Sequence, residues 1–215
     1  MTPSHVVTAD VIQMPRKRAK QLRTRISYLS PDQLDRFLKS AKGHGVREHA
    51  MFLCAVSHGL RAQEICNLRI SDLNLKQGTI HVKRLKGSLD SLQNFMRVKG
   101  NSLFDEEKAL RAWLAAREPD ADDYLFNSQK STQMHRVTVH KLFRAIATSA
   151  GLPEMLRHPH TLKHTCAMLL VDSGANAFVI RQALGHRSFD STLQYVRPSD
   201  QQASQATSQA FSKVF

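Results

Sequence analysis

Hydrophobic residues along the chain recur mostly at helical spacing, and this pattern predicts a largely helical protein. Ser30 and Gln33 have the spacing of a capping box around Pro31, and Leu34 and Phe37 then begin an apolar helical face. This first helix is expected to end at the glycines of positions 43 and 45. The same periodicity predicts further helices over residues 46–57, 62–68, 104–117, 137–150, 161–173, 177–184 and 188–196.

One stretch between these helices has the pattern of short strands instead. Residues 75–78 have the composition of a turn, and Thr79-Ile80-His81-Val82 is a short β-rich run. Residues 92–98 form a weaker strand candidate, and Gly87 is expected to turn the polar connection between the two. The chain is therefore expected to be mainly α with a small antiparallel β-sheet, an α+β fold.

The two ends of the chain are more polar than its middle. We expect a basic N-terminal tail over residues 1–27, one domain over 28–198, and a Gln/Ser/Ala-rich C-terminal tail over 199–215. The N-terminal tail fits either a solvated leader or an arm that lies on a phosphate backbone, and the sequence does not decide between them. Its basic residues are Arg16, Lys17, Arg18, Lys20, Arg23 and Arg25.

The charge of the chain indicates a polyanionic partner. Its 215 residues include 31 Lys and Arg against 18 Asp and Glu, a net charge of +13. No basic amphipathic helix with a bulky apolar face stands out, and no apolar run is long enough to cross a bilayer, so nucleic acid is favoured over a membrane. The N-terminus lacks the order of a secretory signal, so a cytoplasmic protein is the default expectation. No two of the three cysteines have CxxC spacing, so the sequence does not indicate a zinc finger.

Four sequence islands carry the candidate chemistry. They are HGLRAQEICNLRISDL at 58–73, RLKGS at 84–88, HPHTLKHTCAMLLVDSG at 158–174 and IRQALGHRSFDSTLQYVRP at 180–198. In order and spacing they resemble the catalytic domain of tyrosine recombinases, the phage integrase family, over roughly residues 28–198. The first island is most similar to the small fimbrial phase-variation invertases. The resemblance implies the fold of a DNA breaking-rejoining enzyme catalytic domain.

The resemblance also assigns roles to particular residues. Tyr195 would attack a DNA phosphodiester and form a 3′-phosphotyrosine, which keeps the bond energy for rejoining without ATP. Arg61 and His186 would hold the phosphate, His160 would bind it and help to move the tyrosine proton, and Lys86 would protonate the leaving 5′-oxygen. We expect no metal and no other cofactor, because positive side chains would stabilise the transition state. The outcome would be integration, excision or inversion of DNA.

Lys163 is the departure from the family pattern, because the family's second arginine stands at this position. Lysine keeps the charge but loses the planar fork, and Arg157 or Arg181 is a candidate for the missing guanidinium. The substitution leaves open a catalytically weakened DNA-binding regulator or accessory factor, and a general nicking-closing enzyme of the type IB topoisomerase kind shares the same chemistry. His164 lies one helical turn after His160, and such a pair can bind zinc, but no third ligand is evident.

The expected partners follow from the charge and from the resemblance. Double-stranded DNA would be bound by the N-terminal basic residues together with Lys83 and Arg84. The family implies a homotetramer on paired recombination sites, with the C-terminal tail as a possible contact between subunits. DNA-bending accessory proteins are a further expectation, as is a nucleoid-associated location.

Overall fold

The computed structural model describes residues 26–85, 87–117, 123–128 and 133–196, and five single positions beyond them. These five are helical and exposed; they are Ser204, Thr207, Ser208, Phe211 and Ser212. The basic residues at 16–25, the candidate acid Lys86 and most of the C-terminal tail lie outside the described residues. The predictions made for them therefore stay predictions.

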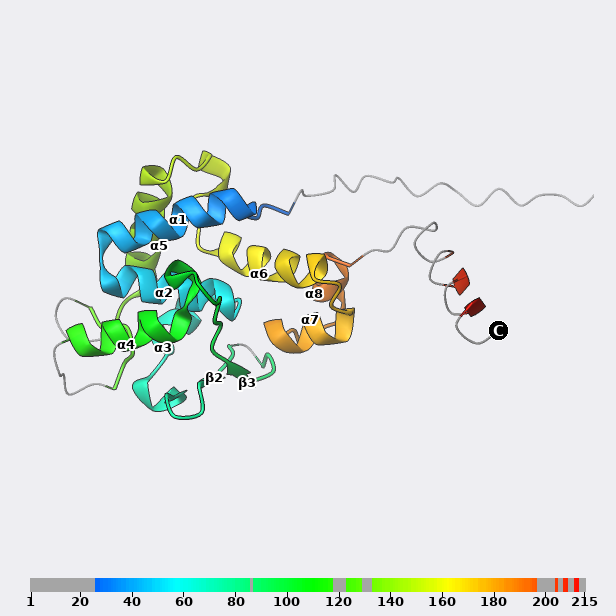
Figure 1. Cartoon of the computed structure of the whole chain (residues 1–215), viewed down its shortest axis with the longest axis horizontal. Coiled ribbons are helices and arrows are strands. Elements are labelled where there is room, and N and C mark those ends of the chain that lie inside the picture. Colours follow the sequence, from blue (N-terminus) through cyan, green and yellow to red (C-terminus); the bar gives the residue numbers. More distant parts are fainter. Residues whose placement is uncertain are drawn as a thin grey trace, which may run out of the picture.

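Helices dominate the described residues (Figure 1). The α-helices are α1 (Pro31–His44), α2 (Val46–Ser57), α3 (Ala62–Asn67), α4 (Glu106–Ala116), α5 (Arg136–Ser149), α6 (His160–Asp172), α7 (Ala177–Leu184) and α8 (Asp190–Leu193). Three short 3₁₀ turns are η1 (Ile70–Asp72), η2 (Ser102–Phe104) and η3 (Glu154–Leu156). The strands are β1 (Leu73–Asn74), β2 (Thr79–Val82) and β3 (Ser91–Asn94).

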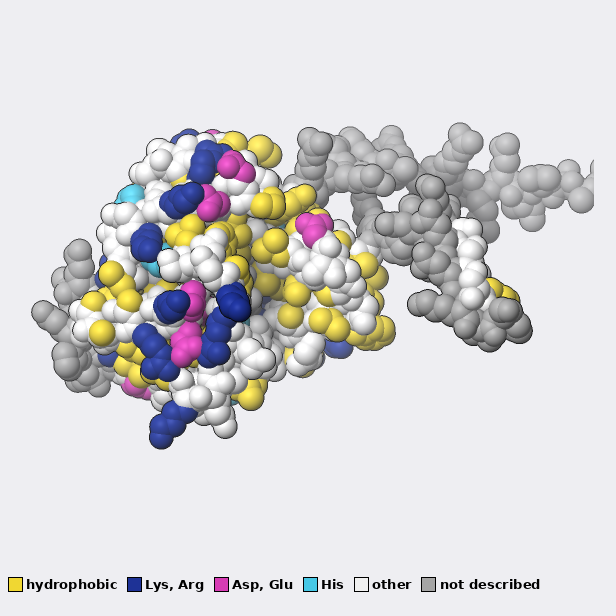
Figure 2. All heavy atoms as spheres, viewed as in Figure 1, with side chains coloured by type: hydrophobic (Ala, Val, Ile, Leu, Met, Phe, Trp, Pro, Cys, Tyr) yellow, Lys and Arg dark blue, Asp and Glu magenta, His cyan; other side chains and the backbone are white. Residues whose placement is uncertain are grey.

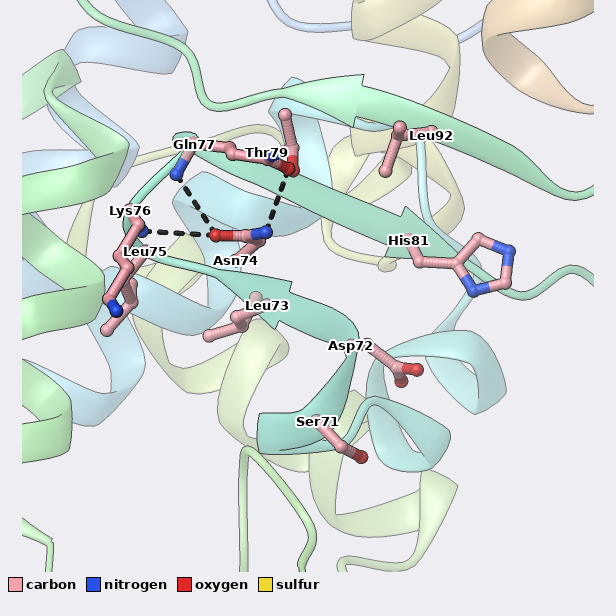
Figure 3. Close-up of a pocket in the computed structure, with 10 residues that line it drawn as sticks. All are labelled: Ser71, Asp72, Leu73, Asn74, Leu75, Lys76, Gln77, Thr79, His81 and Leu92. Carbon is pink, nitrogen blue, oxygen red and sulfur yellow. Dashed lines mark hydrogen bonds between the residues drawn. The ribbon is translucent and has the colours of Figure 1, made fainter.

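The strands form one antiparallel sheet in the order β1-β2-β3. Leu73 pairs with Ile80 across β1 and β2, and His81 pairs with Leu92 across β2 and β3. A hollow of about 510 Å³ lies against this sheet, where the Asn74 side-chain oxygen accepts the backbone N–H groups of Lys76 and Gln77 and orders the β1–β2 turn (Figure 3). None of the candidate catalytic residues lines this hollow, so the candidate chemistry lies elsewhere.

Two hydrophobic clusters hold the helices together. The larger one centres on Phe37, Phe52 and Phe143, which join α1, α2 and α5 with ring centroids 4.7–5.6 Å apart. The smaller one contains Ile180, Leu184 and Tyr195 and packs α6, α7 and the end of α8 together. In Figure 1, α6 runs between the two groups of helices, with α7 and α8 at one end of it. Helix α6 therefore contributes to both clusters, with Leu162 in the larger one and Cys166 and Ala167 in the smaller one.

The predicted architecture is confirmed. The Ser30 capping box is present, with its side-chain oxygen accepting from the Gln33 backbone and the Gln33 side chain accepting from the Ser30 backbone. The seven longer helices lie within two residues of their predicted bounds. The prediction for 188–196 is wrong in length, because α8 covers only Asp190–Leu193. The strand predicted at 92–98 is also shorter, because β3 pairs only along the four residues of β2.

The surface over the last helices is hydrophobic. Leu169, Phe178, Val179 and Leu193 are all more than a third exposed, and hydrophobic side chains gather over this part of the molecule in Figure 2. Within the described ranges, no helix is both long enough and apolar enough to span a membrane.

Candidate active site

Arg61 stands at the first turn of α3, where its neighbours fix its direction. Its backbone N–H donates to Glu64 Oε2 at 2.9 Å, and its Nη1 donates to Glu64 Oε1 at 2.7 Å. The Glu64 carboxylate is fully buried, while the Arg61 side chain remains 35% exposed. Burial alone would raise the pKa of Glu64, but the Arg61 backbone hydrogen bond and the charge of Arg84 outweigh it and lower that pKa. One half of the Arg61 guanidinium is thus anchored, and the rest faces solvent, where an anion can bind.

Arg84 corrects the sequence-based assignment. It was expected to contact DNA, but its side chain is fully buried and its guanidinium is used within the protein. Nη1 donates to Gly59 O and Glu64 Oε2, and Nη2 donates to His58 O and Ala183 O at 2.8 and 2.7 Å. Arg84 therefore ties the turn before Arg61 to the end of α7, and a buried guanidinium with these partners has no surface for a phosphate.

Lys163 lies beside Arg84 and makes similar contacts. It is 2% exposed, and its Nζ donates to Gly59 O and Leu184 O at 2.9 Å each. Burial, followed by the charges of Arg84 and Arg61, lowers the pKa of Lys163 to about 7. The ammonium thus points at two backbone carbonyls inside the protein, between the segment that carries Arg61 and the helix that precedes His186.

The two alternative guanidinium donors are engaged elsewhere. Arg157 donates to Leu152 O at 2.7 Å and to Glu154, and Arg181 donates to Arg187 O at 3.1 Å. The guanidinium that shares an acceptor with Lys163 is that of Arg84, through the Gly59 carbonyl oxygen.

His186 lies two residues after the end of α7, and Gly185 makes the turn between the helix and His186. Gly185 adopts φ 64°, the left-handed conformation that favours glycine, and caps the helix. His186 is 4% exposed, and its Nδ1 lies 3.0 Å from Thr192 Oγ1. Burial, followed by the charge of Lys163, lowers the pKa of His186 to about 4. The ring is thereby held neutral next to the cationic cluster in the DNA-free protein.

Replacing Gly185 by alanine is expected to destabilise the fold. A Cβ atom there would lie 2.7 Å from the Leu89 backbone oxygen and 2.8 Å from the Arg84 side chain, in a conformation that alanine disfavours. We expect a loss of about 1–3 kcal/mol in the free energy of unfolding, measured by urea denaturation. Gly43→Ala is the matched control, because apart from its chain neighbours and the backbone of its own helix no atom lies within 4 Å of the added Cβ. Equal midpoints for the two variants would contradict this account.

Tyr195 is the last member of the site and is 8% exposed. Its ring stacks nearly parallel to that of His186, with centroids 6.3 Å apart. Its hydroxyl lies 2.7 Å from Nδ1 of His164, and the His164 ring is packed edge-on against His160 with centroids 4.5 Å apart. Burial raises the pKa of Tyr195 to about 12. The phenol is therefore protonated near neutral pH and needs a group that accepts its proton before or during attack.

His160 begins α6 and is exposed, unlike the groups behind it. Desolvation, followed by the charges of Lys163 and Arg61, lowers its pKa. The charges of Lys163 and Arg61 also lower the pKa of His186, and the Lys163 ammonium joins the segment before Arg61 to the helix before His186. A site with this excess of positive charge suits an anion such as a phosphodiester.

The two other predicted residues are Lys83, which lies at the surface, and Lys86, which lies outside the described residues. Lys83 is half exposed and pairs with Asp72 at 2.6 Å, so it lies at the surface of the sheet. Lys86 lies outside the described residues, but its neighbours Leu85 and Gly87 are described. The backbone N–H of Leu85 donates to Glu64 Oε1 at 3.3 Å, which brings this connection next to Arg61.

A second cluster of polar side chains is buried behind the site. Donor atoms of Cys54, His58 and Glu106 lie within 4.8 Å of one another, an arrangement that can hold a metal ion. Hydrogen bonds already join these groups: His58 contacts Glu106 at 2.8 Å and Gln93 at 2.9 Å, and Glu106 also accepts the Met96 N–H. Burial alone would lower the pKa of His58, but the Glu106 charge and the hydrogen bonds to Glu106 and Gln93 together outweigh it and raise that pKa. The cluster thus contains a buried ion pair with hydrogen-bond partners, which joins α2, β3 and α4.

Comparison with known proteins decides the identity. The phage integrase family matches residues 27–202, most of the chain. The chain belongs to the phage integrase family of site-specific tyrosine recombinases. It is 32% identical to the type 1 fimbriae regulatory protein FimB of Escherichia coli K12 over 79% of this chain and 83% of FimB. FimE of the same strain is 30% identical over 70% of this chain and 74% of FimE. The predicted likeness to the fimbrial proteins is confirmed.

Solved structures of other recombinases have the same fold. XerA recombinase is 29% identical with a TM-score of 0.70, over 85% of this chain and 64% of that chain. XerH recombinase bound to its difH substrate in a pre-cleavage complex is 26% identical with a TM-score of 0.71, over 85% of this chain and 54% of that chain. The catalytic-domain fold expected from the sequence islands is thereby confirmed.

The recombinase structure adds three residues to the site. They are Glu64, to which the sequence analysis assigns no role, Arg84, which it predicts to bind DNA, and His164, which it treats as half of a possible zinc pair. The spacing of Arg61 and Glu64 at the start of a helix was a usable signal for the first. The side-chain hydrogen bonds of His164 and Arg84 depend on the tertiary fold, since their partners lie 20 to 99 residues away.

Proposed function

We propose that this recombinase cleaves and rejoins double-stranded DNA at specific sites, with Tyr195 as the nucleophile. The observation that carries the proposal is that Tyr195 stacks on His186 and contacts His164, which packs against His160, while Lys163 links the Arg61 turn to this end of α7. The likeness to XerH, which is bound to a DNA substrate in its structure, supports the choice of partner. The products would be integrated, excised or inverted DNA.

Each side chain has a task that its position supports. The exposed part of Arg61 holds two oxygens of the scissile phosphate, and His160 and His186 add hydrogen bonds to it. Tyr195 Oη attacks phosphorus, and the 5′-oxygen leaves with a proton from Lys86, which remains a prediction from the family pattern. Lys163 does not contact the phosphate. Its ammonium donates to the Gly59 and Leu184 carbonyls and so fixes the distance between the Arg61 turn and the end of α7.

The alternative of a catalytically weakened regulator gains no support from the comparisons. A position that holds two backbone segments from inside the protein can be filled by an ammonium as well as by a guanidinium, because two carbonyl acceptors need only two donors. The lysine is thus compatible with an active enzyme.

Further contacts extend the proposal to the assembly on DNA. The basic residues of the 1–27 tail bind the phosphate backbone of the DNA, and Lys83, beside the sheet, adds a further contact to it. Four protomers assemble on paired sites, with the 199–215 tail between subunits and DNA-bending proteins as accessories. The exposed hydrophobic side chains over α6 to α8 support such a contact between protomers. Such a protein would act in the cytoplasm, at the nucleoid.

A trapping experiment tests this function. The protein is incubated with a supercoiled plasmid that carries the DNA flanking its own gene, and the reaction is stopped with SDS. We expect a covalent adduct at the 3′-phosphate end of a discrete break, without added metal or ATP, because the tyrosine keeps the phosphate. Sequencing the broken end locates the site. Tight binding to this DNA with no adduct would overturn the proposal in favour of a DNA-binding regulator.

A further inference from the structure

The hydroxyl of Tyr195 has a specific partner that the family motif does not supply. His164 Nδ1 lies 2.7 Å from Tyr195 Oη, within hydrogen-bond distance. For the phenol to donate in this pair, Nδ1 must be the acceptor, and the ring proton of His164 must then stand on Nε2. The two residues come from α6 and from the turn after α8, so the contact is set by the packing of these helices and not by local sequence.

The other imidazoles of the site are placed for different contacts. His186 Nδ1 is engaged with Thr192 Oγ1 at 3.0 Å, and its ring lies parallel to the Tyr195 ring, with the centroids 6.3 Å apart. His160 contacts the edge of the His164 ring and is exposed at the start of α6. His160 is therefore open to a ligand from solvent, whereas His164 already lies within hydrogen-bond distance of the phenol whose proton has to leave.

We propose that His164 is a catalytic residue of this recombinase and accepts the phenol proton of Tyr195 during DNA cleavage. The assignment rests on the proposed function. In the cleavage step a lone pair of Tyr195 Oη forms a bond to phosphorus, and the phenol proton moves to His164 Nδ1. The bond from phosphorus to the 5′-oxygen breaks, and that oxygen keeps the electron pair and takes a proton from an ammonium acid, which we predict to be Lys86.

The rejoining step returns both protons. The 5′-hydroxyl of the incoming strand attacks the phosphotyrosine and gives its proton to the neutral amine, while His164 gives its proton back to the departing Tyr195 oxygen. No proton is gained or lost over the cycle, and no other reactant is needed. The two histidines of α6 then divide the work, with His160 on the phosphate and His164 on the nucleophile.

The electrostatic surroundings favour this role. Burial, followed by the charges of His160, His158 and Lys163, lowers the pKa of His164 to about 4, so the ring is neutral and its Nδ1 lone pair is available near pH 7. A bound phosphodiester brings negative charge into the site and raises the basicity of the imidazole. The base is thereby weak while the site is empty and stronger when the DNA to be cleaved is in place.

A set of variants separates proton acceptance from simple positioning. His164→Asn keeps a side chain that can accept a hydrogen bond but that cannot take up the proton, and His164→Ala removes the contact. His44→Ala is the matched control, because His44 is an exposed histidine at the end of α1 with its ring on Ser40 O. Thermal unfolding and DNA binding of each variant show that the fold and the substrate complex remain.

Cleavage rates are measured in single turnover on the DNA site that the wild-type adduct identifies. Each variant is also tested on DNA in which sulfur replaces the 5′-bridging oxygen, because a thiolate with a pKa of about 8.5 leaves without an acid. We expect His164→Asn and His164→Ala to be about 10²–10⁴-fold slower than wild type on both substrates. Their rates should climb with pH, because only already ionised Tyr195 can attack. His44→Ala should match wild type.

A measurement without DNA checks the resting contact independently. In ¹⁵N NMR spectra of the free protein, His164 should be neutral at pH 7 with its proton on Nε2, and Tyr195→Phe should shift its Nδ1 resonance. A proton on Nδ1 would overturn the proposal whatever the cleavage data show.

The outcomes separate this assignment from the proposed function. A wild-type adduct together with full activity of His164→Asn would overturn the proton-acceptor role and leave the recombinase function intact. Faster cleavage by His164→Ala would also overturn it, since the hydrogen bond would then restrain the nucleophile. Rescue of the variants by sulfur-bridged DNA would assign His164 to the leaving group instead. Absence of any wild-type adduct would remove the proposed function itself.

Discussion

We expect Tyr195→Phe to abolish the covalent adduct and to leave DNA binding nearly unchanged. The substitution removes one oxygen and keeps the ring, which packs in the smaller hydrophobic cluster and stacks on His186. We expect the cleavage rate to fall by about 10⁴-fold or more, because no other group can take the place of the nucleophile. Loss of the hydrogen bond to His164 should cost only about 0.5–1.5 kcal/mol of stability. SDS gels of stopped reactions and electrophoretic binding assays measure the two effects.

The chain supplies a matched control for this experiment. Tyr28 is 40% exposed and is one of only three tyrosines, so Tyr28→Phe makes the same chemical change outside the site. It should keep both adduct formation and DNA binding. An adduct that persists in Tyr195→Phe and disappears in Tyr28→Phe would move the nucleophile to the N-terminal end of the domain.

The helices were predictable because their apolar residues repeat at helical spacing and because caps mark their ends. Ser30 and Gln33 show this at α1, where the predicted capping box is present. The two-residue strand β1 carries no periodic signal, and the length of β3 is set by the four residues that β2 offers it. Elements whose bounds depend on a pairing partner are thus the ones that the sequence left undefined.

The motif residues of the site were predictable from the sequence, and the buried residues that hold them were not. Arg61, His160, His186 and Tyr195 stand in motifs with family spacing. The structure stacks Tyr195 on His186, packs His164 against both Tyr195 and His160, and links the Arg61 turn to the end of α7 through Lys163. Arg84 looked like one more basic residue of a surface hairpin, and its burial depends on carbonyls 25 and 99 residues away in the sequence. The sequence shows where the cationic side chains are, but only the fold determines whether such a side chain is exposed to solvent or buried against backbone carbonyls.

Lys163 shows the same limit, and it leads to a prediction about activity. Lys163→Met keeps the approximate volume of the side chain but removes both donors to Gly59 O and Leu184 O. The Arg61 turn and the α7 end then lose a shared anchor, and a shift of about 1 Å at a reacting group costs about 10²-fold in rate. We expect the rate of adduct formation to fall by that amount while DNA binding stays close to wild type, because Nζ does not reach the surface. Lys42→Met, at an exposed position of α1, is the control.

Lys163→Arg tests whether the position binds phosphate or holds the backbone. If it bound phosphate, the family's arginine would restore a bidentate contact and raise the cleavage rate. The site is instead filled, with the Arg84 guanidinium already sharing the Gly59 acceptor, so a second guanidinium adds crowding and like charge. We expect no gain in rate from Lys163→Arg. An increase of about tenfold would contradict the backbone-holding role and favour direct contact with DNA.

The same lysine should make stability depend on pH in a definite direction. Its folded-state pKa is about 7, below the ordinary value of 10.5, so between these values the unfolded chain binds more protons than the folded one. The free energy of unfolding of wild type should therefore rise relative to Lys163→Met as the pH increases from 7 to 10, by about 2–4 kcal/mol. Urea denaturation of both proteins across this range measures the difference, in which other titrating groups largely cancel. A difference that stays constant with pH would mean that the ammonium is solvated, and Lys163 would then be free to reach the scissile phosphate after all.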